Sequence, residues 1–312
     1  MAVSTVGGAL IGRIRDTAAP VSMSERVSKT VALLARRGYA LNVERVAEVC
    51  IGGAISPREV RWAVAAAGPE LALADDLVVD RAGLARVDQI RSRAQGHRDD
   101  AGAFVDMTVR FAQTLVALAP FVRSVSIAGS LASGGFRASD DVDLNLIVDD
   151  GHRHLAYVVV NALGLVHALA HRAKPVDDLT RRPIAPRLMT ANLILERSQY
   201  LPLERQDEDM AFELLMAEPL FGIDSIQELI GANPALVEHF PQLADKPAHL
   251  VIEPPAHRLP TALFPAFLDG TARMLGENAW RYMQWTRRHH PDALERVRYV
   301  RSTMRPYALF DR

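Results

Sequence analysis

Apolar residues recur at helical spacing in the first part of the chain. Residues 24–38 place valines and leucines near one face, and Ser24 is suited to begin this helix. Shorter helices are predicted after Asn42 and after Ser56, which is followed by a proline, and two short β-like runs come next. Three helices and a β-hairpin are typical of a winged helix, so residues 23–80 are predicted to form a winged-helix-like domain.

A long helical stretch follows over residues 81–120. Gly96 and Gly102 are candidate break points within it. We expect this stretch to connect the first domain to the next, and we interpret its several arginines as a solvated face.

From residue 121 the pattern changes to an alternation of β-like and helical segments. The predicted elements are a strand at 122–128, a short helix from Ser130, a strand at 142–148, a helix at 153–172 and a strand within 187–196. This order predicts an α/β (α+β) domain with a small mixed sheet over residues 121–203. The remainder, residues 204–312, is predicted to be a helical C-terminal domain.

Composition indicates an ordinary soluble protein. Of 312 residues, 49% are hydrophobic and 23% charged, and the net charge is −1, which argues against a generally basic nucleic-acid binder. Cys50 is the only cysteine, so an intrachain disulfide and a cysteine-based zinc cluster are excluded. Residues 1–22 have the character of a flexible leader without signal-peptide order, and the apolar run at 155–170 is interrupted by polar residues. We therefore expect a cytoplasmic protein without a membrane partner.

A small polar turn follows the first strand of the predicted α/β domain. The strand ends at Ala128, Gly129 makes the turn, and a helix begins near Ser130. Such a turn directs backbone N–H groups toward whatever lies above it, and glycine allows a close approach. The Ser130 hydroxyl adds a further donor. The turn is therefore a candidate phosphate site, although it lacks a lysine.

Two carboxylates begin the next strand. Asp141 and Asp143 are two residues apart, so alternation places them on one face together with Asn145. Adjacent carboxylates repel each other unless a divalent cation lies between them. Acidic and amide residues are poor strand formers, so this face indicates a site rather than a folding requirement. Asp141 and Asp143 are predicted to bind magnesium, or manganese in its place.

The segment GSLASGGFRASDDVDLNLIV resembles the signature of the DNA polymerase β-like nucleotidyltransferase superfamily. Gly129, Ser130, Asp141 and Asp143 match the Gly-Ser and Asp-x-Asp positions. The resemblance implies a nucleotidyltransferase fold, a nucleoside triphosphate donor and magnesium. The chain is also similar to a bacterial branch in which a winged-helix-like segment precedes the catalytic domain and an Asn-x-x-Leu strand and a Pro-Leu-x-Gly stretch follow it. These two motifs correspond here to Asn192–Leu195 and Pro219–Gly222, so the resemblance spans most of residues 24–240.

The third carboxylate usual in that superfamily is missing from its expected strand. The polar residue there is Asn192, whose amide can ligate a metal or contact the nucleotide but cannot accept a proton. Glu196 at the strand's end is the nearest substitute and the predicted third catalytic residue. Glu213 is a more distant candidate, and Asp140 is a further candidate metal ligand, although alternation directs it away from Asp141. Either the site works with two carboxylates or it binds nucleotide without transfer.

Other candidate sites are weaker. His167 and His171 are four residues apart on a helix but lack the glutamate of a metalloprotease motif, so we interpret them as the polar edge of a buried helix. Arg58 and Arg61 are the basic residues of the predicted third helix, and a packing role is favoured there over DNA binding. No GxxxxGK[ST] or GxGxxG motif is present.

The sequence thus predicts an enzyme that moves a nucleoside monophosphate, AMP being favoured, from ATP or another triphosphate to a small-molecule acceptor with release of pyrophosphate. Nothing in the chain resembles a template or primer clamp. Two alternatives stay open: a catalytically degenerate nucleotide-sensing or DNA-binding regulator, and a toxin-like transferase that acts on tRNA or protein.

Overall fold

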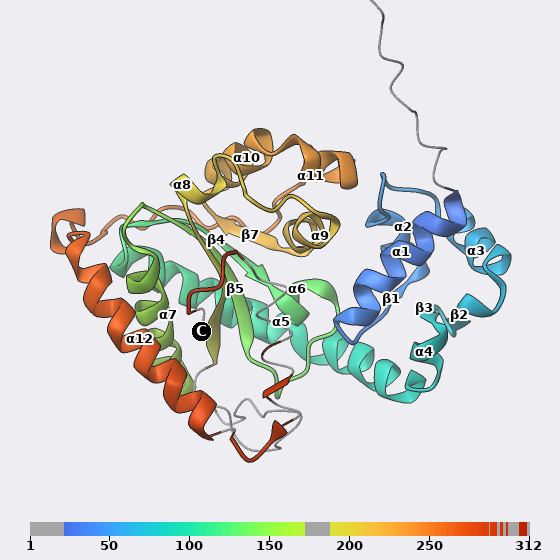
Figure 1. Ribbon diagram of the computed structural model, residues 1–312, viewed down its shortest axis with the longest axis horizontal. Coiled ribbons are helices and arrows are strands. Elements are labelled where there is room, and N and C mark those ends of the chain that lie inside the picture. The colour runs from blue at the N-terminus through green and yellow to red at the C-terminus, as the bar shows by residue number, and fades with distance from the viewer. Residues whose placement is uncertain are drawn as a thin grey trace, which may run out of the picture.

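The computed structural model shows a mixed α/β protein with two small sheets and many helices (Figure 1). It describes residues 22–171, 188–286, 288–291, 294–295, 298 and 306–310.

The N-terminal module, residues 22–84, combines helices with a three-stranded antiparallel sheet of order β1-β3-β2. Its elements are α1 (Met23–Arg36), β1 (Leu41–Asn42), α2 (Val43–Glu48), α3 (Pro57–Ala66), η1 (Gly68–Glu70), β2 (Leu71–Ala74), β3 (Leu77–Asp80) and α4 (Arg81–Leu84). Ser56 caps α3 through a capping box with Glu59, as the sequence favours. The predicted cap of α1 is wrong: Ser22 accepts the capping hydrogen bond, and the Ser24 hydroxyl donates to the Ala63 carbonyl instead.

The connecting segment is mainly one helix, α5 (Val87–Leu118), which continues through both Gly96 and Gly102. The break lies earlier, at Ala85 and Arg86, between α4 and α5. Burial along α5 explains the continuity, because packing of Phe111 and its neighbours against the sheet outweighs the weak helix preference of glycine.

The central sheet has four strands in the order β6-β5-β4-β7. They are β4 (Val122–Ala128), β5 (Val142–Val148), β6 (Met189–Glu196) and β7 (Glu218–Phe221). β4 is antiparallel to both β5 and β7, whereas β5 and β6 run parallel, joined through α7 (Arg153–Ala170). The predicted mixed sheet is confirmed, and β4 and β5 have the predicted bounds. β7 lies within the segment that was expected to be helical, so residues beyond 203 complete the sheet.

Alternation along β5 gives the sheet two different faces. Val142, Leu144 and Leu146 enter a hydrophobic core formed with α5 and α7. The opposite face carries Asp143 and Asn145 and is covered partly by α9. The remaining elements are α6 (Gly129–Ser133), α8 (Arg197–Tyr200), α9 (Glu208–Met216), α10 (Ile223–Ala232), α11 (Pro234–His239), η2 (Pro241–Leu243), η3 (Thr261–Leu263) and α12 (Phe267–Thr286). α12 lies along α7 at the outer side of the sheet (Figure 1).

A second core joins the N-terminal module to the polar side of the sheet. One cluster of buried residues includes Leu34 of α1, Leu193 of β6 and Phe212 of α9. The N-terminal module therefore packs against the rest of the chain through a shared apolar interior, and its position relative to the sheet is determined by side-chain packing.

By length and composition alone, α5 and α7 are apolar enough to cross a membrane. Both instead pack on the sheet, α5 through Phe111 and Leu115 and α7 through Ala156 and Val160. Core helices of soluble proteins pass the same test. One or two such helices are weak evidence of a membrane span, and the cytoplasmic location stays a prediction.

Close contact between α7 and β6 yields a stability prediction. A Cβ atom at Gly164 would lie 2.6 Å from the carbonyl oxygen of Met189, so Gly164→Ala must separate the helix from the strand. We expect the variant to lose about 1–3 kcal/mol of unfolding free energy in urea denaturation. Gly270→Ala on α12 is the matched control, because a Cβ there meets nothing within 4 Å and should stabilise the helix slightly. Equal stability of the two variants would contradict this packing.

Candidate functional site

Strands β4 and β5 bring the Gly-Ser turn and the Asp-x-Asp pair together. Ala128, the last residue of β4, lies opposite Asp143. Gly129 then turns the chain with a φ of +59°, and a Cβ atom built on it would lie 2.2 Å from Oδ2 of Asp143. Glycine is required here for two reasons, the positive φ and the missing side chain. The close approach that the sequence assigned to a ligand is made by the Asp143 carboxylate.

The surroundings of Asp143 disfavour its charged form. Burial and the neighbouring Asp141 carboxylate raise the pKa of Asp143 to about 8, and Glu213 and Asp140 add to the effect. Thr190 of β6 opposes it by donating a hydrogen bond of 2.9 Å to Oδ1. Asp141 and Asp143 therefore act on each other as predicted, and Thr190 is a neighbour that the sequence reading missed.

Ser130 contacts Asp140, the residue that precedes the Asp-x-Asp pair. Its hydroxyl donates to Oδ2 of Asp140 at 3.4 Å. The same oxygen accepts hydrogen bonds from the Arg137 backbone N–H and from the Arg93 guanidinium. Asp140 thus faces two arginines, Arg93 and Arg137.

Asn192 belongs to the same polar face, beside a bulge where the pairing of β5 with β6 shifts register. Its side-chain amide donates to Oδ1 of Asn145 at 3.0 Å and to Oε1 of Glu213 at 2.8 Å. The Asn145 side-chain amide also donates to Oε1 of Glu213, at 3.3 Å. The Arg37 guanidinium lies 3.9 Å from the second carboxylate oxygen of Glu213, Oε2. Glu213 of α9 is therefore the carboxylate that accompanies Asn192.

The prediction that Glu196 completes the site is wrong. β5 and β6 are parallel, and Glu196 pairs with Val148, five residues along β5 from Asp143. At about 3.3 Å per residue the two carboxyl groups lie at opposite ends of the sheet. There Glu196 caps α8 and accepts a hydrogen bond of 2.7 Å from the Gly151 N–H.

Sequence reasoning also missed Arg93. Its side chain is only 16% exposed and forms an ion pair with Asp140, although the arginines of this helix were interpreted as a solvated face. Arg93 additionally donates to the carbonyl of Gly135, in the loop that follows α6. The helical pattern of α5 alone gives no signal for this contact, because the partner lies more than forty residues away.

The two histidines at the end of α7 contact aromatic rings of α5. The His167 ring packs edge-on against Phe111, and the His171 ring against Phe104. Burial lowers the pKa of His167. Across the described parts of the chain, no group of three or more His, Cys, Asp or Glu side chains is arranged to hold a metal ion.

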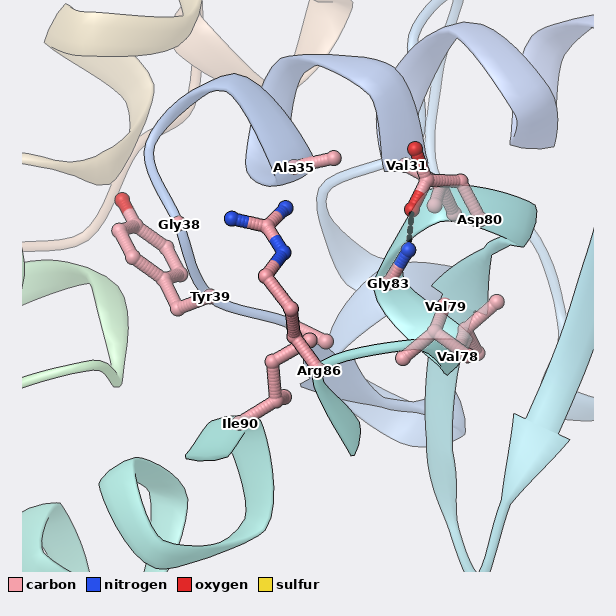
Figure 2. A pocket seen from close by; sticks show the side chains of 11 residues that line it. Val31, Ala35, Gly38, Tyr39, Val78, Val79, Asp80, Gly83, Arg86 and Ile90 are labelled. Carbon is pink, nitrogen blue, oxygen red and sulfur yellow. Dashed lines mark hydrogen bonds between the residues drawn. The ribbon is translucent and has the colours of Figure 1, made fainter. Parts of the chain in front are cut away.

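Two small cavities lie among the described residues, and one of them reaches the polar face at Asn145. One, of about 10 Å³, is inside the N-terminal module, where Arg86 extends between α1 and α4 and Asp80 binds the Gly83 N–H (Figure 2). The other, of about 30 Å³, is lined by Ser126, Asn145 and Lys246 among others. Each holds little more than a water molecule or two. The Lys246 ammonium group donates hydrogen bonds to the last carbonyls of α9, including that of Leu215 at 2.7 Å.

Comparison with known proteins gives no relative: no family model, no curated protein and no solved structure matches this chain.

The raised pKa of Asp143 predicts a pH-dependent stability. Its pKa is raised above the unfolded value of about 3.9, so between roughly pH 4 and pH 8 the folded state holds a proton that the unfolded state has lost. The unfolding free energy should therefore fall as pH rises through this range. The asparagine side chain of Asp143→Asn is uncharged at every pH. We expect the unfolding free energy of this variant to exceed that of the native protein by about 1 kcal/mol or more at pH 8, with a smaller difference at pH 5.

Urea denaturation in the presence of a chelator measures this difference. Asp106→Asn on the exposed side of α5 is the control and should show no such trend. A stability difference for Asp143→Asn that stays constant from pH 5 to pH 8 would contradict the prediction.

Proposed function

We propose that this protein is a magnesium-dependent nucleotidyltransferase that moves a nucleoside monophosphate, with AMP favoured, from a triphosphate such as ATP to a small-molecule acceptor. The observation that carries the proposal is the contact between Gly129 and Asp143, which puts the Gly-Ser turn and the Asp pair at one end of the sheet. The resemblance of these four residues to the DNA polymerase β-like superfamily supports it. In this proposal the N-terminal module is winged-helix-like and the sheet forms the catalytic domain.

The residues present fit a divalent cation. Asp141 and Asp143 place like charges close together in partly buried surroundings, and an added positive charge would offset their repulsion. Magnesium is commonly bound by one or two carboxylates together with substrate phosphates, so two aspartates suffice. When bound, magnesium or manganese supplies charge neutralisation at the transferred phosphorus.

Each residue of the site has a separate part in the transfer. The Ser130 hydroxyl and the backbone of the Gly129 turn bind the β and γ phosphates, and Asp141 and Asp143 hold the metal. The acceptor oxygen forms a bond to the α phosphorus while the bond to the β-bridging oxygen breaks, so pyrophosphate leaves with the electron pair. The acceptor's proton passes to water, because Glu213 already accepts from Asn145 and Asn192.

The engagement of Glu213 favours a second candidate, a regulator that binds nucleotide without transferring it. Both amides and Arg37 surround this carboxylate, so Glu213 is poorly placed to take the proton of an acceptor hydroxyl. DNA binding by the N-terminal module has less support, since Arg61 of α3 is paired with Glu44 at 3.2 Å. A transferase that modifies tRNA or protein differs from the main proposal only in its acceptor.

Label transfer tests the proposal. The native protein is incubated with each α-labelled nucleoside triphosphate, magnesium and a cell extract, and transferred label and pyrophosphate are measured. We expect transfer with ATP, and at least about a hundredfold loss in Asp141→Asn and Asp143→Asn, because each removes a metal ligand. Asp106→Asn, an exposed change on α5, should retain full activity.

The outcomes separate the candidates. Nucleotide binding without transfer would identify the regulator, and label found in tRNA or protein would identify the macromolecular acceptor. Equal transfer by the native protein and both aspartate variants would overturn the assignment of the site.

A further inference from the structure

Helix α12 presents large apolar side chains to solvent along its whole length. Each is 57–75% exposed, and together they are named the α12 stripe: Phe267, Met274, Leu275, Tyr282 and Trp285. At 3.6 residues per turn these positions fall within about a third of the helix circumference, so they form one continuous surface. Contiguous exposed apolar surface of this kind usually marks an interaction site.

The opposite face of α12 packs against α7 (Figure 1). Ala272 and Gly276 are buried there, and a Cβ atom at Gly276 would lie 2.6 Å from the ring of Phe310. The Asp269 carboxylate accepts a hydrogen bond of 2.8 Å from the Leu155 N–H at the start of α7. These contacts orient α12, so the α12 stripe faces away from α7 and is not needed to hold the helix in place.

The charged residues of α12 favour a protein partner. Within the helix two acids, Asp269 and Glu277, balance two arginines, Arg273 and Arg281, so its formal charge is zero. A helix that lies on an anionic membrane usually carries an excess of lysine and arginine beside its apolar face, and a nucleic-acid site needs a basic patch. Neither excess is present within α12.

The α12 stripe is complementary to itself when two copies of the helix run antiparallel. With a twofold axis at Asn278, Met274 of one copy lies level with Tyr282 of the other, and symmetry repeats the contact. The exposed Asn278 side chains then meet at the axis, where each amide offers both a donor and an acceptor. A polar residue at the centre of an apolar helix pair is a known means of setting its register.

Charges along one edge of the α12 stripe support the same arrangement. Glu277 and Arg281 lie on this edge and are joined within the helix at 2.7 Å. Antiparallel helices bring the same edge of each copy together. In the register set by Asn278, Arg281 of one copy is offset from Glu277 of the other by only about 3 Å along the helix axis. Each arginine would therefore gain a second carboxylate.

The area of the α12 stripe suits a dimer. An aromatic side chain covers about 150–250 Å² when fully buried, so at the observed exposures the stripe would remove roughly 600 Å² from water in each copy. A standard interface buries about 800 Å² on each partner. The stripe and the side chains along its edges therefore approach the size of a specific contact.

We propose that the α12 stripe is the interface of a homodimer in which two copies of α12 pack antiparallel about Asn278. α12 lies on α7, whose inner side covers the apolar face of the sheet, so the interface is remote from the face that carries Asp143. The dimer is independent of the proposed function, and failure of one leaves the other standing.

Analytical ultracentrifugation of the full chain over a range of concentrations tests the dimer. We expect the native protein to dimerise with a dissociation constant in the micromolar range. Met274→Glu should raise this constant at least about a hundredfold, because the dimer would bury an unpaired charge twice. Trp62→Glu is the matched control, since Trp62 is an exposed apolar residue on α3 and its replacement should leave dimerisation unchanged.

Further variants test the antiparallel register. Arg281→Glu should weaken the dimer about tenfold, because it makes both facing edges acidic, and the exchange Glu277→Arg/Arg281→Glu should restore it. With glutathione disulfide as the oxidant, Asn278→Cys should form a disulfide between two copies, because the introduced thiols meet at the twofold axis. Asp106→Cys on α5 should form none. The native Cys50 is buried and does not interfere.

Three outcomes would each overturn the proposal: a native protein that stays monomeric at every concentration, a dimer that Met274→Glu leaves intact, and Asn278→Cys without cross-linking. Binding of a monomeric native protein to anionic lipid vesicles would assign the α12 stripe to a membrane instead. Circular dichroism and urea denaturation verify that each variant is folded, and the charge exchange decides the question if Met274→Glu does not fold.

Discussion

The pairing of β4 with β5 is the constraint on which the candidate site depends. It sets Ala128 opposite Asp143, so the chain can turn at Gly129 only because no side chain is present there. The contact joins two polar motifs that a dozen residues separate in the sequence. It also buries a carboxylate beside another, which costs stability. A sheet under no functional requirement would place apolar residues at this end.

The N-terminal module packs against the loop that follows the Gly-Ser turn. The ring of Tyr39 lies against Gly135, where an added Cβ would come within 2.7 Å of it, and Leu41 similarly approaches Gly134. These glycines belong to the loop that leads from the Gly-Ser turn toward Arg137. The module is thus packed on the loop that holds the turn, and a shift of the module would move the loop.

The hydrophobic pattern correctly predicted the elements that depend on residues close together in the sequence. The bounds of β4 and β5 and the position of the turn follow from alternation and from Gly129, and both were predicted correctly. Glu196 was misassigned because nearness along β6 says nothing about which end of a parallel pair a residue reaches. Arg93 was missed for a related reason, since a helix that contacts a distant loop has the same periodicity as one that faces water.

The segment Ser139-Asp140-Asp141, which precedes β5, places two carboxylates next to each other in the chain. Alternation divides the acids, with Asp141 joining Asp143 and Asp140 facing Arg93 and Arg137. Three carboxylates close together would repel strongly, and the two guanidinium groups offset one of them. The strand end thereby holds the repelling carboxylates of Asp141 and Asp143 beside the ion pairs that Asp140 makes with two arginines. The repulsion between Asp141 and Asp143 is therefore the charge imbalance that a bound cation would relieve in the proposed function, because Asp140 already has arginine partners.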